Sequence, residues 1–485
     1  MKNSNNNNVR PYGFKKLRCY LYFYYQLPQF IEKLQEMGKN VFAVAMLSTL
    51  FAVSLLYNAK LAVVFLLMTI TIVFILRSEL AVINIYFFVY LAFAGFADRL
   101  SISLSGSQSI NLLGILNIMM ILFFYIRLKD FIQVRREYWN KSIIYPILLF
   151  SLYLVLTTPF SVSLSTSVRG LTRVLAAFSF YLLTYFVVVS NNNIEKKIFK
   201  FITAIFIALL ICGIIEYITG YNIFYGRSIT NLIYQDYQII QSFERIRTSF
   251  PHAPGYSFAL LIFLPLYLYF FMRKKDGKYL YRLLPFLFLL NILLTFTRIT
   301  WIAVALQLIL FFFLFKYKKI LRFALPLGII FVFISNKIIS RASTVDSSAL
   351  GRLELFQYAL SIFKEHPIFG SGIGTFFELS AHEFGKNIAA HGDYMLMFAE
   401  TGIFGGIGYL TLLFTMLVFA VKNLKENDFA KVALLMLVSF LVYGITGNAL
   451  ANGHIFWGLL GIYNGVIVRE NPQKNISSGL EFESN

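Results

Sequence analysis

Arginine is the residue type in this chain that points most directly to chemistry, because its planar guanidinium group can bind two oxygens of a phosphate at once. Arg298 interrupts an apolar stretch, LLTFTRITWIAV, where a charge is costly and therefore indicates a functional site. Arg245 and Arg247 stand shortly before a Phe-Pro-His sequence, and Arg352 begins a later amphipathic segment. We expect these arginines to bind an anionic, phosphorylated ligand. The structural alternative is that they anchor helix ends to lipid headgroups, or that Arg247 pairs with Glu244.

His391 is the histidine whose surroundings best suit acid–base catalysis. It is followed by Gly392 and Asp393 at the predicted start of a helix that also carries Glu400. Imidazole titrates near ambient pH, so a neutral His391 could take a proton from a sugar hydroxyl. Asp393 or Glu400 would orient that imidazole or bind the substrate. A purely structural histidine is the alternative.

The spacing of these residues does not predict a metal ion or a nucleotide as cofactor. His382 and Glu383 precede His391 and Asp393 in HEFGKNIAAHGD, but the spacing is not HExxH and no third ligand has helical spacing. The glycines of 370–374 lack the Gly-Lys-Ser or Gly-Lys-Thr that a nucleotide phosphate loop requires. We therefore expect no cofactor. Four further glycines lie inside an apolar run and predict close packing of membrane helices: Gly402, Gly405, Gly406 and Gly408.

The elements that position these residues are predicted to be membrane-spanning helices. Of the 485 residues, 58% are hydrophobic and only 14% are charged, and the mean hydropathy is +0.69. A soluble protein is about one quarter charged, so this composition excludes a large water-soluble enzyme. Apolar runs near the bilayer-crossing length of about 20 residues predict an all-α integral membrane protein with about 12–14 transmembrane helices. The candidate runs lie near 41–57, 61–76, 80–97, 110–126, 143–158, 171–189, 198–217, 256–272, 283–297, 299–315, 320–335, 393–420, 432–447 and 455–468.

The excess of positive charge predicts how these helices are oriented. The chain has 43 basic and 23 acidic residues, which gives a net charge of +20. If residues 1–40 are cytoplasmic, most of the basic residues fall in cytoplasmic segments, as the positive-inside rule requires. Both termini are therefore predicted to be cytoplasmic, and the charge needs no nucleic acid to explain it. Arginine dominates the basic residues left outside, which again fits a phosphorylated ligand there.

The predicted organisation has five parts, in which a large loop separates two groups of helices. They are a cytoplasmic polar and basic tail (1–40), transmembrane helices 1–11 (41–335), a large extracytoplasmic loop (336–392), transmembrane helices 12–14 (393–468) and a cytoplasmic tail (469–485). Within the loop, Leu353, Phe356, Leu360 and Phe363 recur at helical spacing. This stripe predicts an amphipathic helix lying on the outer surface. A loop of this length in a compact protein is usually functional.

Three stretches of the chain resemble the O-antigen ligase and Wzy-type polymerase superfamily of bacterial membrane glycosyltransferases. They are LTFTRITW at 294–301, GRLELFQYALSIFKEHPIFGSGIG at 351–374 and AHGDYMLMFAETGIFGGIG at 390–408. RTSFPHAPGYSFAL at 247–260 is a weaker likeness to another arginine motif of the family. Two positions depart from the family pattern. Gly392 stands where asparagine usually follows the histidine, and Thr297 stands where serine is common before the arginine.

The resemblance implies a multispan helical protein of the bacterial cytoplasmic (inner) membrane whose large external loop forms a catalytic lid. It implies transfer of a glycan from undecaprenyl diphosphate to an acceptor sugar on the outer face, without metal or nucleotide. The product would be a cell-surface polysaccharide, such as O-antigen, capsule, exopolysaccharide or teichuronic acid. The expected partners are a polyprenyl diphosphate-linked glycan donor, a glycan or glycolipid acceptor and the lipid bilayer. In this interpretation His391, Arg298 and Arg352 are catalytic. The residues that bind the substrate are Arg247, Arg245, Asp393 and Glu400.

Two other interpretations stay open at this point. A polymerase and a ligase share donor chemistry and fold, so the sequence does not separate them. A multispan anion or solute transporter of the same superfamily is an alternative from a different class. A transporter places charged groups near the bilayer midplane, and Glu216 is the main candidate at such a depth. The arginines at the outer edge favour the transferase.

Overall fold

The computed structural model describes residues 78–93, 101–103, 109–133, 138–227, 245–273, 279–316, 347–385, 392–447 and 453–470. The chain divides into two compact units, residues 1–85 and 86–485. In the first unit the described residues are 78–85, which include the beginning of one helix. The second unit holds the other described elements.

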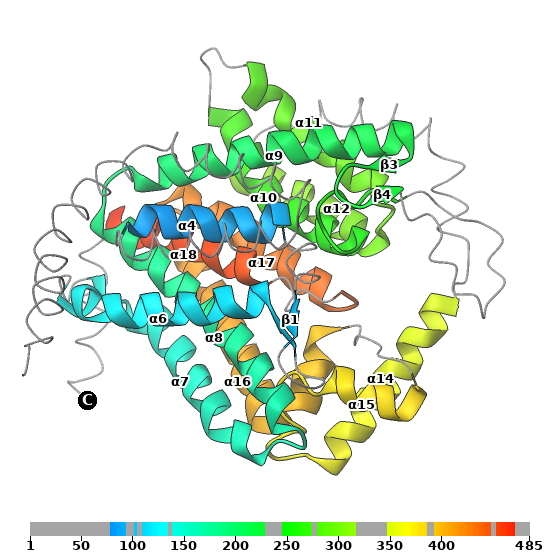
Figure 1. Cartoon of the computed structure of the whole chain (residues 1–485). Coiled ribbons are helices and arrows are strands. Elements are labelled where there is room, and N and C mark those ends of the chain that lie inside the picture. Colours follow the sequence, from blue (N-terminus) through cyan, green and yellow to red (C-terminus); the bar gives the residue numbers. More distant parts are fainter. Residues whose placement is uncertain are drawn as a thin grey trace, which may run out of the picture. The chain divides into compact units, whose positions relative to one another are not determined.

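Helices make up nearly all of the described structure (Figure 1), which confirms the predicted all-α class. The helices are α4 (Glu79–Phe88), the π-helix η1 (Val89–Phe93), α6 (Leu112–Gln133), α7 (Lys141–Thr157), the 3-10 helix η3 (Thr158–Phe160), α8 (Leu164–Ser190), α9 (Ile194–Thr219), α10 (Ala253–Arg273), α11 (Tyr279–Leu294), α12 (Arg298–Phe315), α14 (Ser347–Glu365), α15 (Phe376–Phe384), α16 (Asp393–Lys422), α17 (Asp428–Gly444) and α18 (Gly453–Glu470). The strands are β1 (Ser101–Ser103), β2 (Ser109–Asn111), β3 (Tyr221–Asn222) and β4 (Gly226–Arg227). They form two antiparallel pairs, in which Ile102 lies opposite Ile110 and Asn222 lies opposite Gly226.

The described helices coincide with the apolar runs of the sequence, from α6 to α12 and from α16 to α18. Local signals set several helix ends. Asn140 caps α7 by accepting a hydrogen bond from the Ser142 backbone N–H at 3.1 Å. Gly220 ends α9 in the left-handed conformation that glycine adopts without strain. Three predicted runs lie outside the described residues, namely 41–57, 61–76 and 320–335.

Six helical segments among the described residues are long and apolar enough to cross a membrane: α7 with η3, α8, α9, α10, α12 and α16. The segment Lys141–Phe160 has 20 residues. At about 1.5 Å per residue, such a segment matches a hydrocarbon core of about 30 Å. These helices support a multipass membrane protein. The number of spans beyond these six and the orientation of the chain stay predictions.

Small residues allow α18 to pack closely along α8. Gly458, Gly461 and Gly465 face α8, and a methyl group at Gly461 would lie only 2.4 Å from the Tyr181 carbonyl oxygen. Thr184 adds a hydrogen bond of 3.0 Å to the Gly458 carbonyl oxygen. Lipid tails are as apolar as leucine, so membrane helices associate through such close packing and hydrogen bonds. This pair of helices forms a central part of the bundle.

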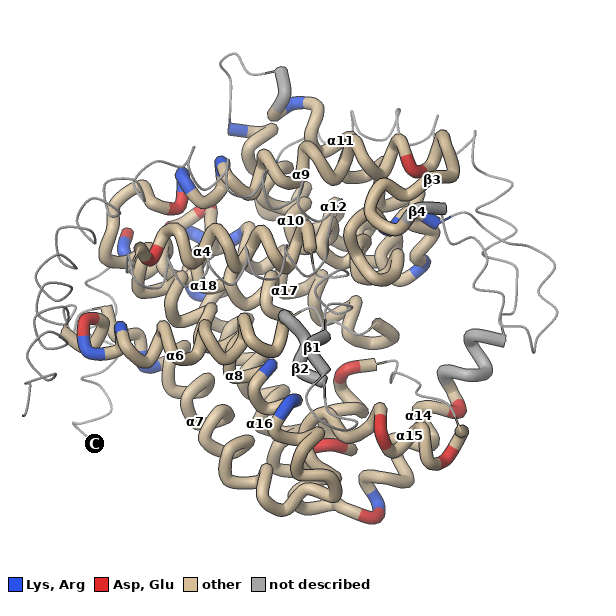
Figure 2. The backbone as a smooth tube through the Cα atoms, viewed as in Figure 1, with Lys and Arg blue, Asp and Glu red and all other residues tan. Residues whose placement is uncertain are grey.

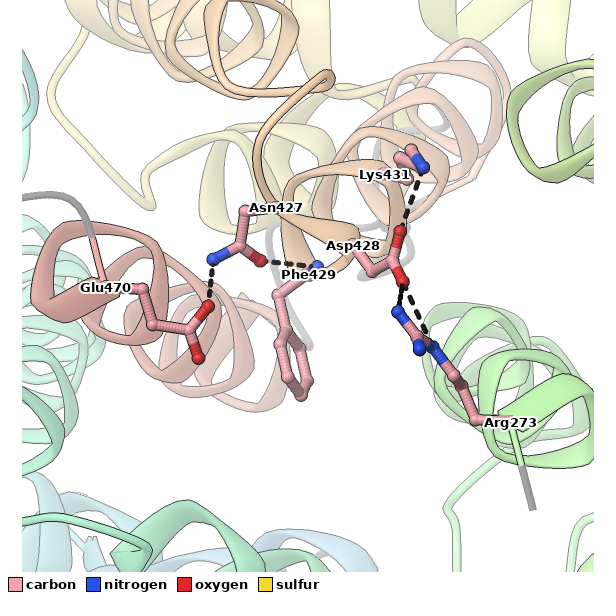
Figure 3. Close-up of polar contacts among 6 residues, drawn as sticks. All are labelled: Arg273, Asn427, Asp428, Phe429, Lys431 and Glu470. Carbon is pink, nitrogen blue, oxygen red and sulfur yellow. Dashed lines mark hydrogen bonds and ion pairs between the residues drawn. The ribbon is translucent and has the colours of Figure 1, made fainter. Parts of the chain in front are cut away.

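Charged residues lie mainly near helix ends, and the middles of α7, α10 and α12 carry none (Figure 2). At one such end, residues from α10, α17 and α18 meet in a polar cluster (Figure 3). Asn427 caps α17 and donates a hydrogen bond of 2.6 Å to Glu470. Asp428 accepts hydrogen bonds from Arg273 and Lys431. The cluster joins three helices on the side that we predict to be cytoplasmic.

The predicted amphipathic helix is present as α14, which forms a small layer with α15 against the first part of α16. The packed core of this layer consists of Leu355, Ala359, Ile362, Phe376 and Ala399. The predicted stripe packs only in its second half: Leu353 and Phe356 are exposed, whereas Leu360 and Phe363 are half-buried and the Phe363 ring lies 5.9 Å from that of Phe398. Helical spacing located the helix correctly. It did not show that the buried core of this helix consists of Leu355, Ala359 and Ile362.

Candidate functional site

Residues 245–249, called the arginine loop, lie against the turn between α11 and α12. The Arg245 guanidinium donates through Nε to the Thr295 carbonyl oxygen at 2.9 Å and through Nη2 to Thr297 Oγ1 at 3.1 Å. The next residue after this turn is Arg298, the first residue of α12. The structure therefore brings the segments that carry three of the predicted arginines together at one end of these helices.

Glu216, in the last turn of α9, holds the arginine loop in its shape. Its side chain is buried, and its carboxylate accepts hydrogen bonds from the backbone N–H of Thr248 at 2.9 Å and of Arg247 at 3.3 Å. A carboxylate that accepts backbone N–H groups forms charge-assisted hydrogen bonds, which are the strong ones. In the sequence Glu216 looks like an isolated charge in an apolar run. Its partners are the peptide groups of a distant loop.

Two residues at this end have backbone conformations that residues other than glycine rarely adopt. Thr248 has a φ of 49° and Phe296 a φ of 48°, and both are buried. Left-handed residues of this kind cost about 1–3 kcal/mol each and persist where surrounding contacts hold them. Asn222 provides one such contact by donating to the Thr248 carbonyl oxygen at 3.0 Å. Strain of this kind clusters at functional sites, which supports a site at the arginine loop.

The Arg247 side chain is held on two sides. It is only 8% exposed, and its Nη1 donates to the Pro251 carbonyl oxygen at 2.9 Å. Its guanidinium carbon lies 4.0 Å from the centre of the Tyr225 ring, a cation–π contact. Tyr225 is held in turn by a hydrogen bond of 2.9 Å from its hydroxyl to the Ser249 carbonyl oxygen. Arg247 is thus a cation with a fixed position, and the sequence did not single out Tyr225.

A second ordered segment, the glycine loop at 370–374, packs against α8 and α16. Its three glycines have φ values of 74°, 112° and 85°, which favour glycine. Buried Glu400 accepts hydrogen bonds from the N–H groups of Gly374 at 2.8 Å and Phe376 at 3.0 Å. Both of its carboxylate oxygens are therefore engaged with the loop backbone, a structural role that the sequence did not indicate. Its assignment to the substrate stays a prediction.

The remaining predicted residues lie at the edge of the described structure. Asp393 is buried at the start of α16, and the N–H of Gly392 before it donates to the Gly447 carbonyl oxygen at 3.3 Å. Arg352 belongs to α14, but its side chain and the whole of His391 are outside the described part. Whether these groups meet stays a prediction. Within the described residues, no group of three or more His, Cys, Asp or Glu side chains could hold a metal ion.

Arg173 is a candidate that the sequence analysis did not select. It lies on α8 one turn after Gly170, where an added methyl group would lie 2.3 Å from the backbone of the glycine loop. Arg173 is exposed and forms no hydrogen bond or ion pair with any described residue. The sequence does contain a signal that could have identified Arg173. Arg169 and Arg173 are four residues apart and therefore share one helix face, at the start of an otherwise apolar run.

Glu378 of α15 connects the external layer to the start of α8. Its carboxylate accepts a hydrogen bond from the Thr166 hydroxyl, to which Arg169 also donates at 3.1 Å. The Thr166 hydrogen bond lowers the pKa of Glu378 below its ordinary value, and a hydrogen bond from Ser163 acts in the same direction. The carboxylate is therefore held in its charged form.

A buried polar network extends from the arginine loop into the helix bundle. The Tyr86 hydroxyl lies 3.2 Å from His454 Nδ1, and Tyr86 and Tyr90 donate to the same asparagine oxygen. Tyr90 belongs to η1, whose Leu91 carbonyl oxygen accepts a hydrogen bond of 2.7 Å from the Ser249 hydroxyl. Short π-helices are frequent at functional sites. The network thus ties the arginine loop to buried helices.

Comparison with known families finds a match over part of the chain. Residues 283–410 match the family model described as O-antigen ligase. The matched segment runs from α11 into α16 and contains Arg298, Arg352, His391 and Glu400, whereas the arginine loop precedes it. The chain therefore carries an O-antigen ligase domain, and the predicted resemblance to that superfamily is confirmed. A search of curated proteins finds no match.

Proposed function

We propose that this chain transfers a glycan from an undecaprenyl diphosphate carrier to an acceptor sugar, at the outer face of the bacterial cytoplasmic membrane. The O-antigen ligase domain at 283–410 supports the reaction class, glycosyl transfer in polysaccharide biosynthesis. The long apolar helices support a membrane location. The lipid diphosphate donor and the outer face belong to the proposal. Polymerase and ligase share this chemistry, and both fit it.

The observation that carries the proposal is the fixed position of arginines at one end of membrane helices. Arg245 is bonded to the turn before Arg298, and Arg247 is held between Tyr225 and Pro251. Guanidinium groups that are fixed before a ligand arrives stabilise a developing negative charge without reorganisation. A lipid-linked diphosphate that departs from a sugar develops such a charge at a membrane surface.

In the proposed reaction, the oxygen of the acceptor hydroxyl attacks the anomeric carbon of the donor sugar. The bond between that carbon and the diphosphate oxygen breaks, and the diphosphate leaves with the bonding electrons. His391 takes the hydroxyl proton, which contributes about 10²–10⁴-fold to the rate. Arg298, Arg352 and Arg247 neutralise the departing diphosphate, and Arg173 adds a cation beside the glycine loop. The donor brings its own activated bond, so the reaction needs no nucleotide.

The position of Glu216 bears on the transporter alternative. A transporter requires a charged group that can bind its solute or coupling ion deep in the membrane. The carboxylate of Glu216 is engaged by the backbone N–H groups of Thr248 and Arg247. This engagement makes Glu216 less suited to bind a solute and supports the transferase.

Purified protein in lipid nanodiscs tests the proposal. Given a lipid diphosphate-linked glycan and an acceptor, it should form transferred or lengthened product in EDTA without nucleotide. Arg298→Lys should lose this activity. Arg282→Lys is the matched control, because Arg282 lies near the other end of the neighbouring helix α11 and should tolerate the change. A strict need for added divalent metal would contradict the mechanism, and solute uptake without any transfer would establish the transporter instead.

A further inference from the structure

Gly402 divides α16 into two parts with different surroundings. Its backbone, with a φ of 69° and a ψ of −170°, is not helical and lies in a region that is almost confined to glycine. The part after Gly402 runs to Lys422, about 20 residues, and matches a hydrocarbon core of about 30 Å. The Tyr153 hydroxyl of α7 donates to the Thr401 carbonyl oxygen at this interruption, at 2.6 Å. The part of α16 after the interruption is therefore long enough to cross the hydrocarbon core by itself.

Large apolar side chains cover the outward faces of α7 and of the second part of α16, which pack against each other. Each of the following is more than half exposed: Leu149, Leu152 and Leu156 of α7, and Phe404, Ile407 and Phe414 of α16. A continuous apolar band on helices of bilayer length is a surface that lipid acyl chains cover.

This apolar band continues onto the segment between α14 and α15. Phe160 at the end of η3 is exposed, and its ring stacks on that of Phe369 with the ring centres 5.4 Å apart. Ile368 is exposed beside it. The Pro367 carbonyl oxygen accepts a hydrogen bond of 2.8 Å from the Ile403 N–H, so this segment lies directly at the interruption of α16. Exposed apolar area of this kind is costly in water and is covered at low cost by lipid.

We propose that Phe160, Ile368 and Phe369 insert among the acyl chains of the adjacent leaflet and anchor the external layer to the membrane. Lipid is the partner because these side chains continue the lipid-facing band of α7 and α16. The anchor would set the depth of the glycine loop, which follows Phe369 directly. Glu400 and Arg173 beside that loop then lie near the phosphate groups of the leaflet. At that depth Arg173 would meet the diphosphate of a lipid-linked donor. This consequence rests on the proposed function, whereas the anchor itself does not.

Fluorescence quenching in vesicles without donor tests the insertion. In a variant with Cys19 and Cys212 replaced by serine, an environment-sensitive fluorophore is attached to Ile368→Cys. Gln357→Cys, at an exposed polar position of α14, is the matched control. In vesicles of phosphatidylethanolamine and phosphatidylglycerol, a nitroxide on the lipid acyl chain should quench the probe at position 368 at least twofold more than at 357. Aqueous iodide should give the reverse order.

A second probe position and an activity measurement keep the outcomes separate. Phe160→Cys provides an independent probe if the first variant does not fold, and it should show the same quenching as position 368. Equal quenching of all three probes by iodide, with no effect of the lipid nitroxide, would overturn the anchor. If the predicted quenching is seen in a protein that never transfers a glycan, the anchor stands and the proposed function fails.

Discussion

Replacing Glu216 by alanine should release the arginine loop. The change removes the acceptor of two backbone N–H groups, those of Arg247 and Thr248. A buried donor left without a partner costs about 1–3 kcal/mol, so the pair would cost about 2–6 kcal/mol. That amount matches or exceeds the strain of about 1–3 kcal/mol at Thr248, which only local contacts maintain. The loop should then relax, and the Arg247 guanidinium should leave the Tyr225 ring.

Two measurements on the same preparation test this prediction. Thermal unfolding reports the lost stability, and donor affinity reports the displacement of Arg247. Total stabilities of domains are about 5–15 kcal/mol, so the variant should melt earlier and still fold in the cold. Donor affinity should fall about tenfold or more, because about 1.4 kcal/mol corresponds to a factor of ten. Glu216→Gln keeps one acceptor oxygen and should give an intermediate result.

A matched control separates loss of stability from loss of the loop. Glu195 lies at the opposite end of α9 and pairs with Arg469 at 3.0 Å. Glu195→Gln should lower the melting temperature and leave donor affinity unchanged. Full donor affinity in Glu216→Ala would refute the role of Glu216, because Arg247 would then keep its position without this carboxylate.

Three further perturbations test other parts of the structure. Gly402→Ala should destabilise the protein by about 3 kcal/mol or more, because a methyl group would lie 2.1 Å from the Ile368 carbonyl oxygen at a φ of 69°. Gly408→Ala is the control, because the atom nearest to its added methyl group is 3.2 Å away. Equal melting temperatures of the two variants would contradict this prediction. The pKa of Glu378 is lowered in the folded protein, so its contribution to stability is present above the ordinary glutamate pKa and is lost as pH falls through the lowered value. Unfolding measured from pH 7 downward should show this loss, and a Glu378→Gln variant with the same pH profile would exclude it. A cysteine at Ser347 should react with an impermeant thiol reagent on intact cells, whereas labelling only after lysis would reverse the predicted orientation.

The helices could be predicted because the length and hydropathy of an apolar run are local properties of the sequence. α8 and α10 coincide with such runs. The conformation at Gly402 could not be predicted in this way. The sequence predicts close helix packing for Gly402 as for Gly405 and Gly408, but the φ of 69° at Gly402 interrupts the helix. Only the contact with the segment after α14, distant in the sequence, explains this difference.

The candidate site could be predicted in its residue types but less well in their roles. Arg245 meets Thr295 across 50 residues of chain, a contact that no local pattern encodes. Glu216 and Glu400 are both acids in apolar runs. The expected depth of Glu216 in the membrane made it the main candidate of the transporter alternative, and the position of Glu400 after His391 predicted that it orients the imidazole or binds the substrate. Both accept N–H groups from the backbone of distant loops. Arg173 went unselected because its nearness to the glycine loop is a tertiary feature.

The central claim is that fixed arginines bind a lipid diphosphate. Its most direct test compares Arg298→Lys with His391→Ala. Donor affinity and turnover are measured for both variants, with equal amounts of folded protein. Lysine keeps the charge but replaces a planar fork with a flexible point charge. Arg298→Lys should therefore weaken donor binding and nearly abolish transfer. His391→Ala should lower turnover by about 10²–10⁴-fold with donor binding almost unchanged. Near-normal donor binding and turnover in Arg298→Lys would contradict the claim, because a headgroup anchor is the role that lysine fills as well as arginine.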